Sequence, residues 1–210
     1  MKRAIALIAL LLSGCASAAE ISSDSSPMQT GQRVMPPTGF IGFCVRHVGD
    51  CTGGTDAPQT VILTPEKLLQ LAMVNDSVNA LPQVLDRGEH WDVAGSSGGD
   101  CEDLALAKRK MLIESGWPVS SLLLATAERW NGEFHAVLIV ATDRGDLVLD
   151  NLNRAIVAWD ETPYAWKKRQ SEMRPFLWVS LDRSTFRSET NALPPIGEPA
   201  FVTSAIRTKD

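Results

Sequence analysis

The stretch Gly98-Gly99-Asp100-Cys101-Glu102-Asp103 leads directly into a helical run, Leu104 to Glu114. A glycine pair and an acid-flanked cysteine here combine a candidate nucleophile with a helix start and a group of carboxylates. A thiol in the first turn of a helix faces the positive end of the helix dipole, which favours thiolate over thiol. Cys101 is therefore a candidate catalytic nucleophile, and it needs a base that another part of the chain must supply.

The cysteine count singles out the same residue. The chain of 210 residues has four cysteines, and Cys15 lies in an N-terminal stretch with the pattern of a secretion signal. Cys44 and Cys51 are seven positions apart with Gly49-Asp50 between them, so in an oxidising compartment they can close a short loop as a disulfide. Cys101 is then the thiol left over. The alternative is that Cys101 is a buried structural cysteine.

Residues 1–19 have the pattern of a signal peptide, because a basic start, Lys2-Arg3, precedes an apolar run too short to span a bilayer. We therefore expect an exported, periplasmic protein. Two processing routes are open. Ala16-Ser17-Ala18 is a small-residue cleavage site, whereas Leu12-Ser13-Gly14-Cys15 is similar to the lipobox of bacterial lipoproteins and would anchor the chain to lipid through Cys15.

Length and composition predict a single domain with a hydrophobic core, since 44% of the residues are hydrophobic. We expect residues 20–39 to form a flexible linker, residues 40–182 to form the domain, and residues 183–210 to form a peripheral tail. The formal net charge of −5 argues against nucleic acid as a partner.

Helical periodicity dominates the first half of the domain. Thr64-Pro65 is typical of a helix start, with Thr64 as the N-cap. The apolar spacing of this helix weakens at Asn75-Asp76, where a break can occur. Asn75 and Asn79 are interpreted as solvent-facing or capping residues. The helix that carries Cys101 is expected to end at Gly116-Trp117-Pro118.

Extended periodicity follows. Runs rich in Val, Leu and Ile are separated by turn signals, which predicts an antiparallel meander of Val119 to Thr126, Phe134 to Thr142 and Leu147 to Asp150. A helix-like stretch near Tyr164 to Glu172 and a final strand, Phe176 to Ser180, are expected to complete the sheet.

Among the three histidines, His135 is the candidate base because it lies at the start of a strongly apolar strand. Asp150, at the end of the next strand, is the candidate residue to orient it, and the two share a face by parity. With the turn centred on Asp143 to Asp146, Asp150 would lie opposite Ile139, roughly 13 Å along the strand from His135. This register does not by itself bring the pair together.

Several motifs resemble the bacterial transglutaminase-like cysteine peptidases, the LapG-type periplasmic proteases. The core of the resemblance is the acid-flanked cysteine followed at a distance by a histidine and an aspartate. The first half of the domain is similar to that of rhizobial-type members. The similar features are the two cysteines and the helix with two Val-Asn pairs. The matching motifs are Gly99-Asp100-Cys101-Glu102-Asp103, Gly116-Trp117-Pro118, Phe134-His135-Ala136-Val137, Leu147 to Asn151, Phe43-Cys44, Cys51, Val74-Asn75 and Val78-Asn79.

The resemblance implies an α+β, papain-like or transglutaminase-like fold, with the nucleophile at the N-terminus of a core helix packed on an antiparallel sheet. It implies a catalytic triad of Cys101, His135 and Asp150. It also implies calcium as a cofactor, bound by carboxylates next to the nucleophile, which map to Asp100, Glu102 and Asp103; oxygen ligands clustered in this way suit calcium.

The implied partners are a protein substrate of the large surface-adhesin type and an inner-membrane receptor that reads a cyclic dinucleotide. Three alternatives stay open. Asp100 and Asp103 can simply cap the helix. The same triad can carry out another acyl transfer, either transamidation or hydrolysis of cell-wall peptides. The chain can also be a non-catalytic, lipid-anchored binding module in which Cys101 is buried.

Overall fold

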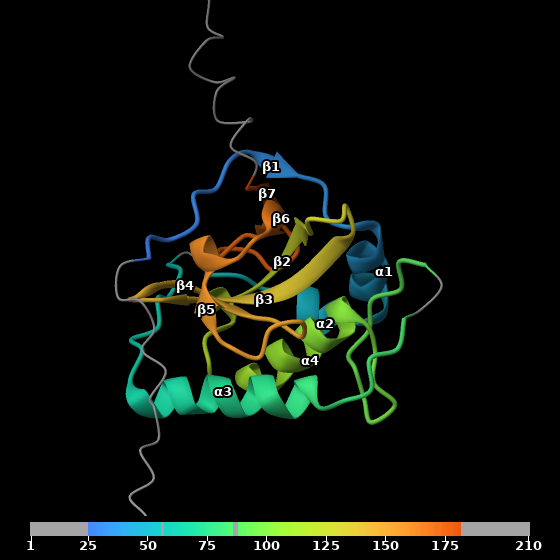
Figure 1. The fold of residues 1–210 in the computed structure, drawn as a ribbon. Coiled ribbons are helices and arrows are strands. Elements are labelled where there is room, and N and C mark those ends of the chain that lie inside the picture. Colours follow the sequence, from blue (N-terminus) through green and yellow to red (C-terminus); the bar gives the residue numbers. More distant parts are fainter. Residues whose placement is uncertain (1–24, 56, 86–87, 182–210) are drawn as a thin grey trace, which may run out of the picture.

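A computed structural model describes residues 25–55, 57–85 and 88–181, and within this part of the chain seven strands form one antiparallel sheet (Figure 1). The strand order is β1-β7-β6-β2-β3-β4-β5. The strands are β1 (Arg33–Val34), β2 (Leu122–Glu128), β3 (Phe134–Thr142), β4 (Gly145–Leu149), β5 (Val157–Ala158), β6 (Ala165–Gln170) and β7 (Trp178–Ser180). The helices are α1 (Thr38–Arg46), α2 (Val48–Cys51), α3 (Pro65–Asn79) and α4 (Cys101–Glu114), with short 3₁₀ turns η1 (Val119–Ser121) and η2 (Trp159–Glu161).

The expected α+β class is confirmed, and the core explains why the helices lie where they do. In the strands β2, β3 and β4 successive side chains point to opposite faces, and both faces are buried. One face packs on α4 through residues such as Leu106, Leu122 and Leu138. Figure 1 shows α4 between the sheet and α3. The N-terminus of α4, where Cys101 lies, is thereby fixed against the sheet.

The predicted meander is present, but its register differs from the expectation by two residues. Thr142 pairs with Gly145 and Leu138 with Leu149, so the loop consists of Asp143 and Arg144 alone. Gly145 has a φ of +93°, a backbone conformation that glycine adopts without strain. A turn of four residues was the wrong expectation, because Gly145 already belongs to the strand β4.

The stretch expected to be helical near Tyr164 to Glu172 is instead the strand β6, which lies between β2 and β7. Its sequence, Ala165-Trp166-Lys167-Lys168-Arg169-Gln170, contains residues that suit a helix. Pairing on both sides of the strand overrides this preference. The expected final strand is present as the shorter β7.

The N-terminal part of the chain differs from the expected flexible linker. From Ser25 onwards it packs on the sheet, and β1 pairs with β7 and covers that edge. Met28 is buried against the face of the sheet opposite α4, and its backbone N–H donates to Asp146 Oδ2 at 2.8 Å. The segment 25–39 is therefore part of the fold, because it covers both an apolar face and a strand edge. Residues 1–24 and 182–210, with the expected signal and tail, lie outside the described residues.

Helix α3 begins as predicted, since the Thr64 side chain accepts a hydrogen bond from the Lys67 backbone N–H at 3.3 Å. The helix continues through Asn75 without a break. The interpretation of its asparagines as solvent-facing or capping is wrong. Asn75 is fully buried and donates to the carbonyl of Arg154 at 3.2 Å, while Asn79 donates to the carbonyl of Asp150 at 2.8 Å. Both amides therefore hold the loop that follows β4.

The predicted disulfide is present, and Cys44 and Cys51 join α1 to α2 with their Cα atoms 5.5 Å apart. Cys101 is the free cysteine within the described residues.

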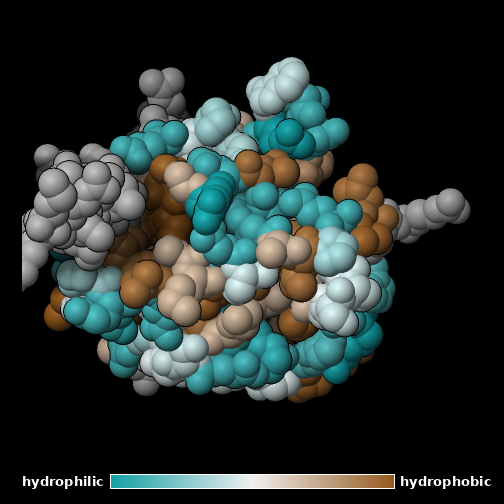
Figure 2. Space-filling model, turned by 60° about the horizontal axis from the view of Figure 1, so that its bottom comes forward, coloured by the Kyte–Doolittle hydropathy of each residue, from teal (hydrophilic) through white to brown (hydrophobic). Residues whose placement is uncertain are grey.

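No helix of the described residues is both long and apolar enough to cross a bilayer. On the α3 side, hydrophobic residues lie scattered among hydrophilic ones, as Figure 2 shows, and Leu69 and Met73 are among those exposed. Such scattered residues are ordinary for a protein surface.

Candidate active site

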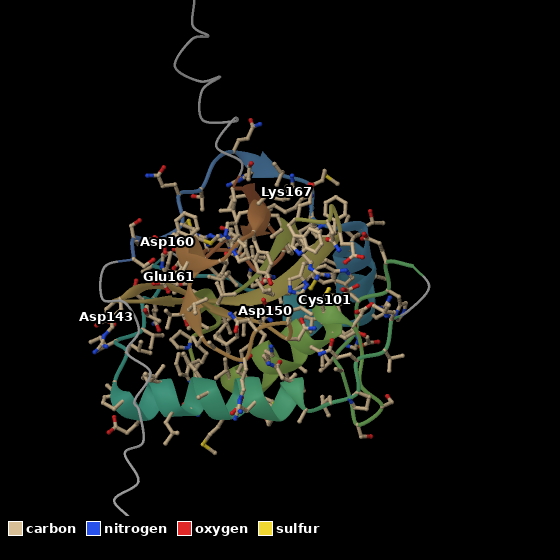
Figure 3. The ribbon with its side chains drawn as sticks, viewed as in Figure 1. Cys101, Asp143, Asp150, Asp160, Glu161 and Lys167 are labelled. Carbon is tan, nitrogen blue, oxygen red and sulfur yellow. A yellow bond between two sulfur atoms is a disulfide. The ribbon has the colours of Figure 1, made fainter. Side chains whose placement is uncertain are left out.

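The glycine pair before the nucleophile shapes the turn that leads into α4. Gly98 has a φ of +83°, and a Cβ there would overlap the carbonyl of Pro82. Both backbone groups of Gly99 are hydrogen-bonded to this neighbouring segment. Its N–H donates to the Pro82 carbonyl at 3.1 Å, and its carbonyl accepts from the Val84 N–H at 2.9 Å. The pair therefore allows the chain to pass close to residues 82–84 before the helix begins at Cys101 (Figure 3).

Cys101 and His135 both line a cleft of about 290 Å³, together with Pro37 and Trp91. The thiol donates a hydrogen bond to Glu102 Oε2 at 3.0 Å. Burial, and then the neighbouring Glu102 carboxylate, raise the pKa of the Cys101 thiol, while the backbone N–H of Ala136 acts in the opposite direction. Both of the main influences on this thiol therefore act against the expected thiolate. Burial of the thiol, and then its contact with the Glu102 carboxyl group, oppose the stabilisation that the helix end offers a thiolate.

His135 and Asp150 form a buried pair. Their side chains are each 3% exposed, and His135 Nε2 lies 2.8 Å from Asp150 Oδ1. Burial acts to raise the pKa of Asp150, but the interaction with His135 and hydrogen bonds from Tyr164 and the Leu152 backbone together hold it below its ordinary value. A carboxylate at Nε2 leaves Nδ1 as the ring nitrogen available for proton transfer.

The two-residue shift in register accounts for this contact. Because Leu149 pairs with Leu138, the following residue, Asp150, comes level with Val137 and not with Ile139. Asp150 is then offset from His135 by two positions, about 7 Å along the strand, and the two side chains bridge this distance. The pair was predicted, whereas the register that forms it was not.

Two further residues hold Asp150, and neither was predicted. Tyr164, the only tyrosine in the sequence, donates from Oη to Asp150 Oδ2 at 2.5 Å, and its ring meets that of His135 edge to face at 5.4 Å between centroids. Asn79 binds the backbone carbonyl of Asp150. Tyr164 could not be found from spacing, because it precedes β6, which was expected to be helical.

The three candidate metal ligands do not lie together. The carboxyl groups of Asp100 and Glu102 are in hydrogen-bonding contact, and burial, together with that contact, raises the pKa of Glu102 to about 7. Asp103 instead accepts the backbone N–H of Asp92 at 2.6 Å and so holds the preceding loop. Within the described residues no group of three or more candidate ligand side chains is gathered. The carboxyl groups of Asp100 and Glu102 therefore lie together as a pair, whereas that of Asp103 holds the loop before the helix.

Comparison with protein families matches residues 30–185 to the bacterial transglutaminase-like cysteine proteinases. No curated protein matches the chain. The similar solved structures include Legionella pneumophila LapG, which is 24% identical with a TM-score of 0.46, over 59% of this chain and 74% of that chain. A calcium-bound form of LapG is 22% identical with a TM-score of 0.47, over 61% and 81%. An EGTA-treated form is 25% identical with a TM-score of 0.45, over 53% and 66%.

The family match extends over most of the chain and includes every residue of the cleft described above. The chain therefore belongs to the bacterial transglutaminase-like cysteine proteinases and is a cysteine peptidase of that family.

Proposed function

We propose that the protein is an endopeptidase in which Cys101, His135 and Asp150 form the catalytic triad. The observation that carries this proposal is the buried His135–Asp150 pair, whose histidine lines the same cleft as the only free thiol of the described residues. A nucleophile, a base and a third residue that fixes the orientation of the base are the components that thiol-dependent acyl transfer needs.

In the proposed mechanism, His135 Nδ1 takes the proton of the Cys101 thiol as the sulfur attacks the carbonyl carbon of the peptide bond. The bond between sulfur and carbon forms, and the oxyanion is stabilised by backbone N–H groups at the start of α4, with that of Cys101 as the natural donor. His135 then protonates the leaving amine. Water, deprotonated by His135, hydrolyses the thioester and regenerates the thiol. Asp150 keeps Nε2 hydrogen-bonded throughout.

We also propose that calcium supports this activity through Asp100 and Glu102. Two carboxyl groups in contact repel one another when both are ionised, and a bound cation would neutralise that charge. Backbone carbonyls or water would have to complete the ligand shell. Loss of activity on addition of a chelator, restored by calcium and not by magnesium, is the expected result.

A protein substrate follows from the family, and we propose that it is a large surface adhesin cleaved in the periplasm. In this proposal the protein is exported by its N-terminal signal, either as a soluble form or anchored through Cys15, and an inner-membrane receptor that reads a cyclic dinucleotide regulates it. Mass measurement of the mature protein from wild-type cells and from a Cys15→Ala strain would distinguish the two forms.

The decisive experiment compares wild type with Cys101→Ala and Cys101→Ser on adhesin fragments, on peptidoglycan and on a protein substrate with an added amine donor. Cleavage of the adhesin by wild type alone is expected. Release of cell-wall peptides without protein cleavage, or incorporation of the amine, would replace the proposal by another acyl transfer. Inactivity of the wild type on all three, together with failure of a thiol probe to label Cys101, would favour a binding module.

A further inference from the structure

A second cavity, of about 370 Å³, lies at the other end of α4 from the nucleophile. It is lined by the loop after the disulfide, by the start of β2 and by the turn after β6. Arg109, which also lines it, is eight residues after Cys101 on α4, about 12 Å along the helix. The proposed peptidase mechanism uses no residue of this cavity, so the inference below does not rest on that mechanism.

Arg109 is a buried cation without a carboxylate partner among the described residues. Its side chain is only 4% exposed, and its Nε donates a hydrogen bond to the carbonyl of Leu122 at 3.1 Å. The acid that influences it is the exposed Asp50 on α2, which forms no ion pair with it within this part of the chain. Burial lowers the pKa of Arg109 to about 10, so the guanidinium still carries its charge at neutral pH.

A second buried arginine has the carboxylate partner that Arg109 lacks among the described residues. Arg169 is 3% exposed, and its Nη2 lies 2.7 Å from the Glu172 carboxylate. Glu172 also lines the cavity, but it is already engaged by Arg169. The fold thus supplies a counter-ion to one buried arginine, whereas the other lines a cavity and has no ion pair among the described residues. A buried charge without a partner is unfavourable, and an anion in the cavity would relieve it.

The lining indicates which kind of anion fits. A guanidinium presents parallel N–H groups that match the two oxygens of a carboxylate. The wall of the cavity has an apolar part, which includes Pro118, Val119, Leu123 and Met173, and a polar part, which includes Thr52, Gln59 and Ser120. The volume lies in the range of cavities that hold small ligands. A carboxylate attached to a compact apolar body satisfies both the charge and the wall.

We propose that this cavity binds a monocarboxylate with a small apolar body, of the kind found at the C-terminus of a peptide, through the guanidinium of Arg109. The site is separate from the Cys101 cleft. The ligand is either a free N-acylated amino acid or the end of a longer peptide, and the two share the chemistry that Arg109 recognises.

The test measures binding to the intact protein by calorimetry and by thermal shift, using N-acetylvaline, its amide, inorganic phosphate and a tripeptide that ends in free valine. The free acid is expected to bind and to raise the melting temperature, whereas the amide is not. Stronger binding of the tripeptide would identify a peptide end, and equal or weaker binding a free acid. Absence of acid binding, or equal binding of acid and amide, would overturn the proposal, as would a preference for phosphate.

Variants locate the site. Arg109→Gln keeps a donor for the Leu122 carbonyl and is expected to weaken acid binding by about tenfold or more. Lys110→Gln removes one charge from the neighbouring, exposed position and should leave binding unchanged. Val119→Trp would fill the cavity while Arg109 stays in place, so it tests the site even if Arg109→Gln fails to fold. Undiminished binding in Val119→Trp would contradict the assignment.

One further variant tests whether the chain supplies its own carboxylate. Asp56 falls outside the described residues but lies in the sequence between Thr55, which lines the cavity, and Gln59, which also lines it. Acid binding that is present in wild type and unchanged in Asp56→Asn is expected. Binding that occurs only in Asp56→Asn would mean that Asp56 occupies the cavity, and the proposal would be wrong.

Discussion

The thiol of Cys101 donates a hydrogen bond to its neighbour Glu102, and this contact adds to the effect of burial in raising the pKa of the thiol. The position of a cysteine at a helix start was readable from the sequence, and so was the presence of acids beside it. Which acid contacts the sulfur was not, because that depends on side-chain directions at the first turn of α4. Glu102 turns to the thiol and to Asp100, whereas Asp103 turns to the backbone of Asp92.

Replacing Glu102 by Gln is expected to make Cys101 more reactive. Burial is the largest cause of the raised thiol pKa and remains in this variant, but the Glu102 carboxylate adds to it, so its loss lowers that pKa by about one unit. The thiolate fraction at neutral pH would rise about tenfold for each unit. The rate of alkylation by iodoacetamide, in the presence of a chelator, measures this. Glu114→Gln, at the other end of α4, is the matched control, and equal rates in both variants would contradict the expectation.

Replacing Tyr164 by Phe is expected to lower kcat by about tenfold with little change in KM, because it removes one hydrogen bond from Asp150 but keeps the ring against His135. That hydrogen bond helps to hold the pKa of Asp150 low, so its loss raises this pKa. The stability that ionised Asp150 contributes is present above its unfolded-state pKa, about 4, and is lost as the pH falls through its folded-state pKa.

In Tyr164→Phe this loss therefore begins at a higher pH than in wild type. Activity profiles and unfolding midpoints between about pH 3 and pH 6 would record both effects. Trp166→Phe, which alters the ring that packs on Tyr164 but no contact of Asp150, serves as the control. If the acid limb of the activity profile did not shift in Tyr164→Phe, the hydroxyl would not be affecting the pKa of Asp150.

At the scale of elements, the sequence predicts which strands exist better than how they pair. The apolar runs of β2, β3 and β4 are long and bounded by turn signals, so their existence and order were predictable. The hairpin register depends on whether Gly145 belongs to the turn or to the strand, and the sequence alone does not decide between them. Strand β6 was missed because partners on both sides determine it, and those partners are distant in sequence.

Helix α3 reaches the site through Asn79, so Asn79→Ala is expected to lower kcat more than it lowers stability. The change leaves the carbonyl of Asp150 without its amide donor and frees the residue that orients His135. The expected loss of unfolding free energy is about 1–2 kcal/mol. Urea unfolding and steady-state kinetics would be measured together.

The matched control for Asn79→Ala is Asn75→Ala, which removes an amide from the same helix and the same loop, but at Arg154. A similar or larger loss of stability with a smaller effect on kcat is expected, since Asn75 does not hold Asp150. If the two variants lost kcat in proportion to stability, α3 would only support the fold and would not position the site.

At the scale of the whole molecule, the N-terminal segment 25–39 contacts both the sheet and the cleft. Its first part covers the apolar face opposite α4, β1 pairs with β7 and forms the edge of the sheet, and Pro36 and Pro37 line the cleft beside Cys101. The Ser, Pro and Gly residues of the segment favoured a linker. No local sequence signal could show that Met28 packs on an apolar face of the sheet, because the strands of that face are distant in sequence. The segment therefore connects the stability of the sheet with the shape of the cleft.

Met28→Ala tests this connection. Met28 is 4% exposed and packs on the sheet, so its truncation is expected to reduce the unfolding free energy by about 2–5 kcal/mol. Met35→Ala, in the same segment but at a position 72% exposed, should change it by less than about 0.5 kcal/mol. Denaturant unfolding measures both. If Met28→Ala behaved like Met35→Ala, the segment would not be part of the core. If Met28→Ala also raised KM while Met35→Ala did not, the segment would be transmitting a loss of packing on one face of the sheet to Pro36 and Pro37 at the cleft.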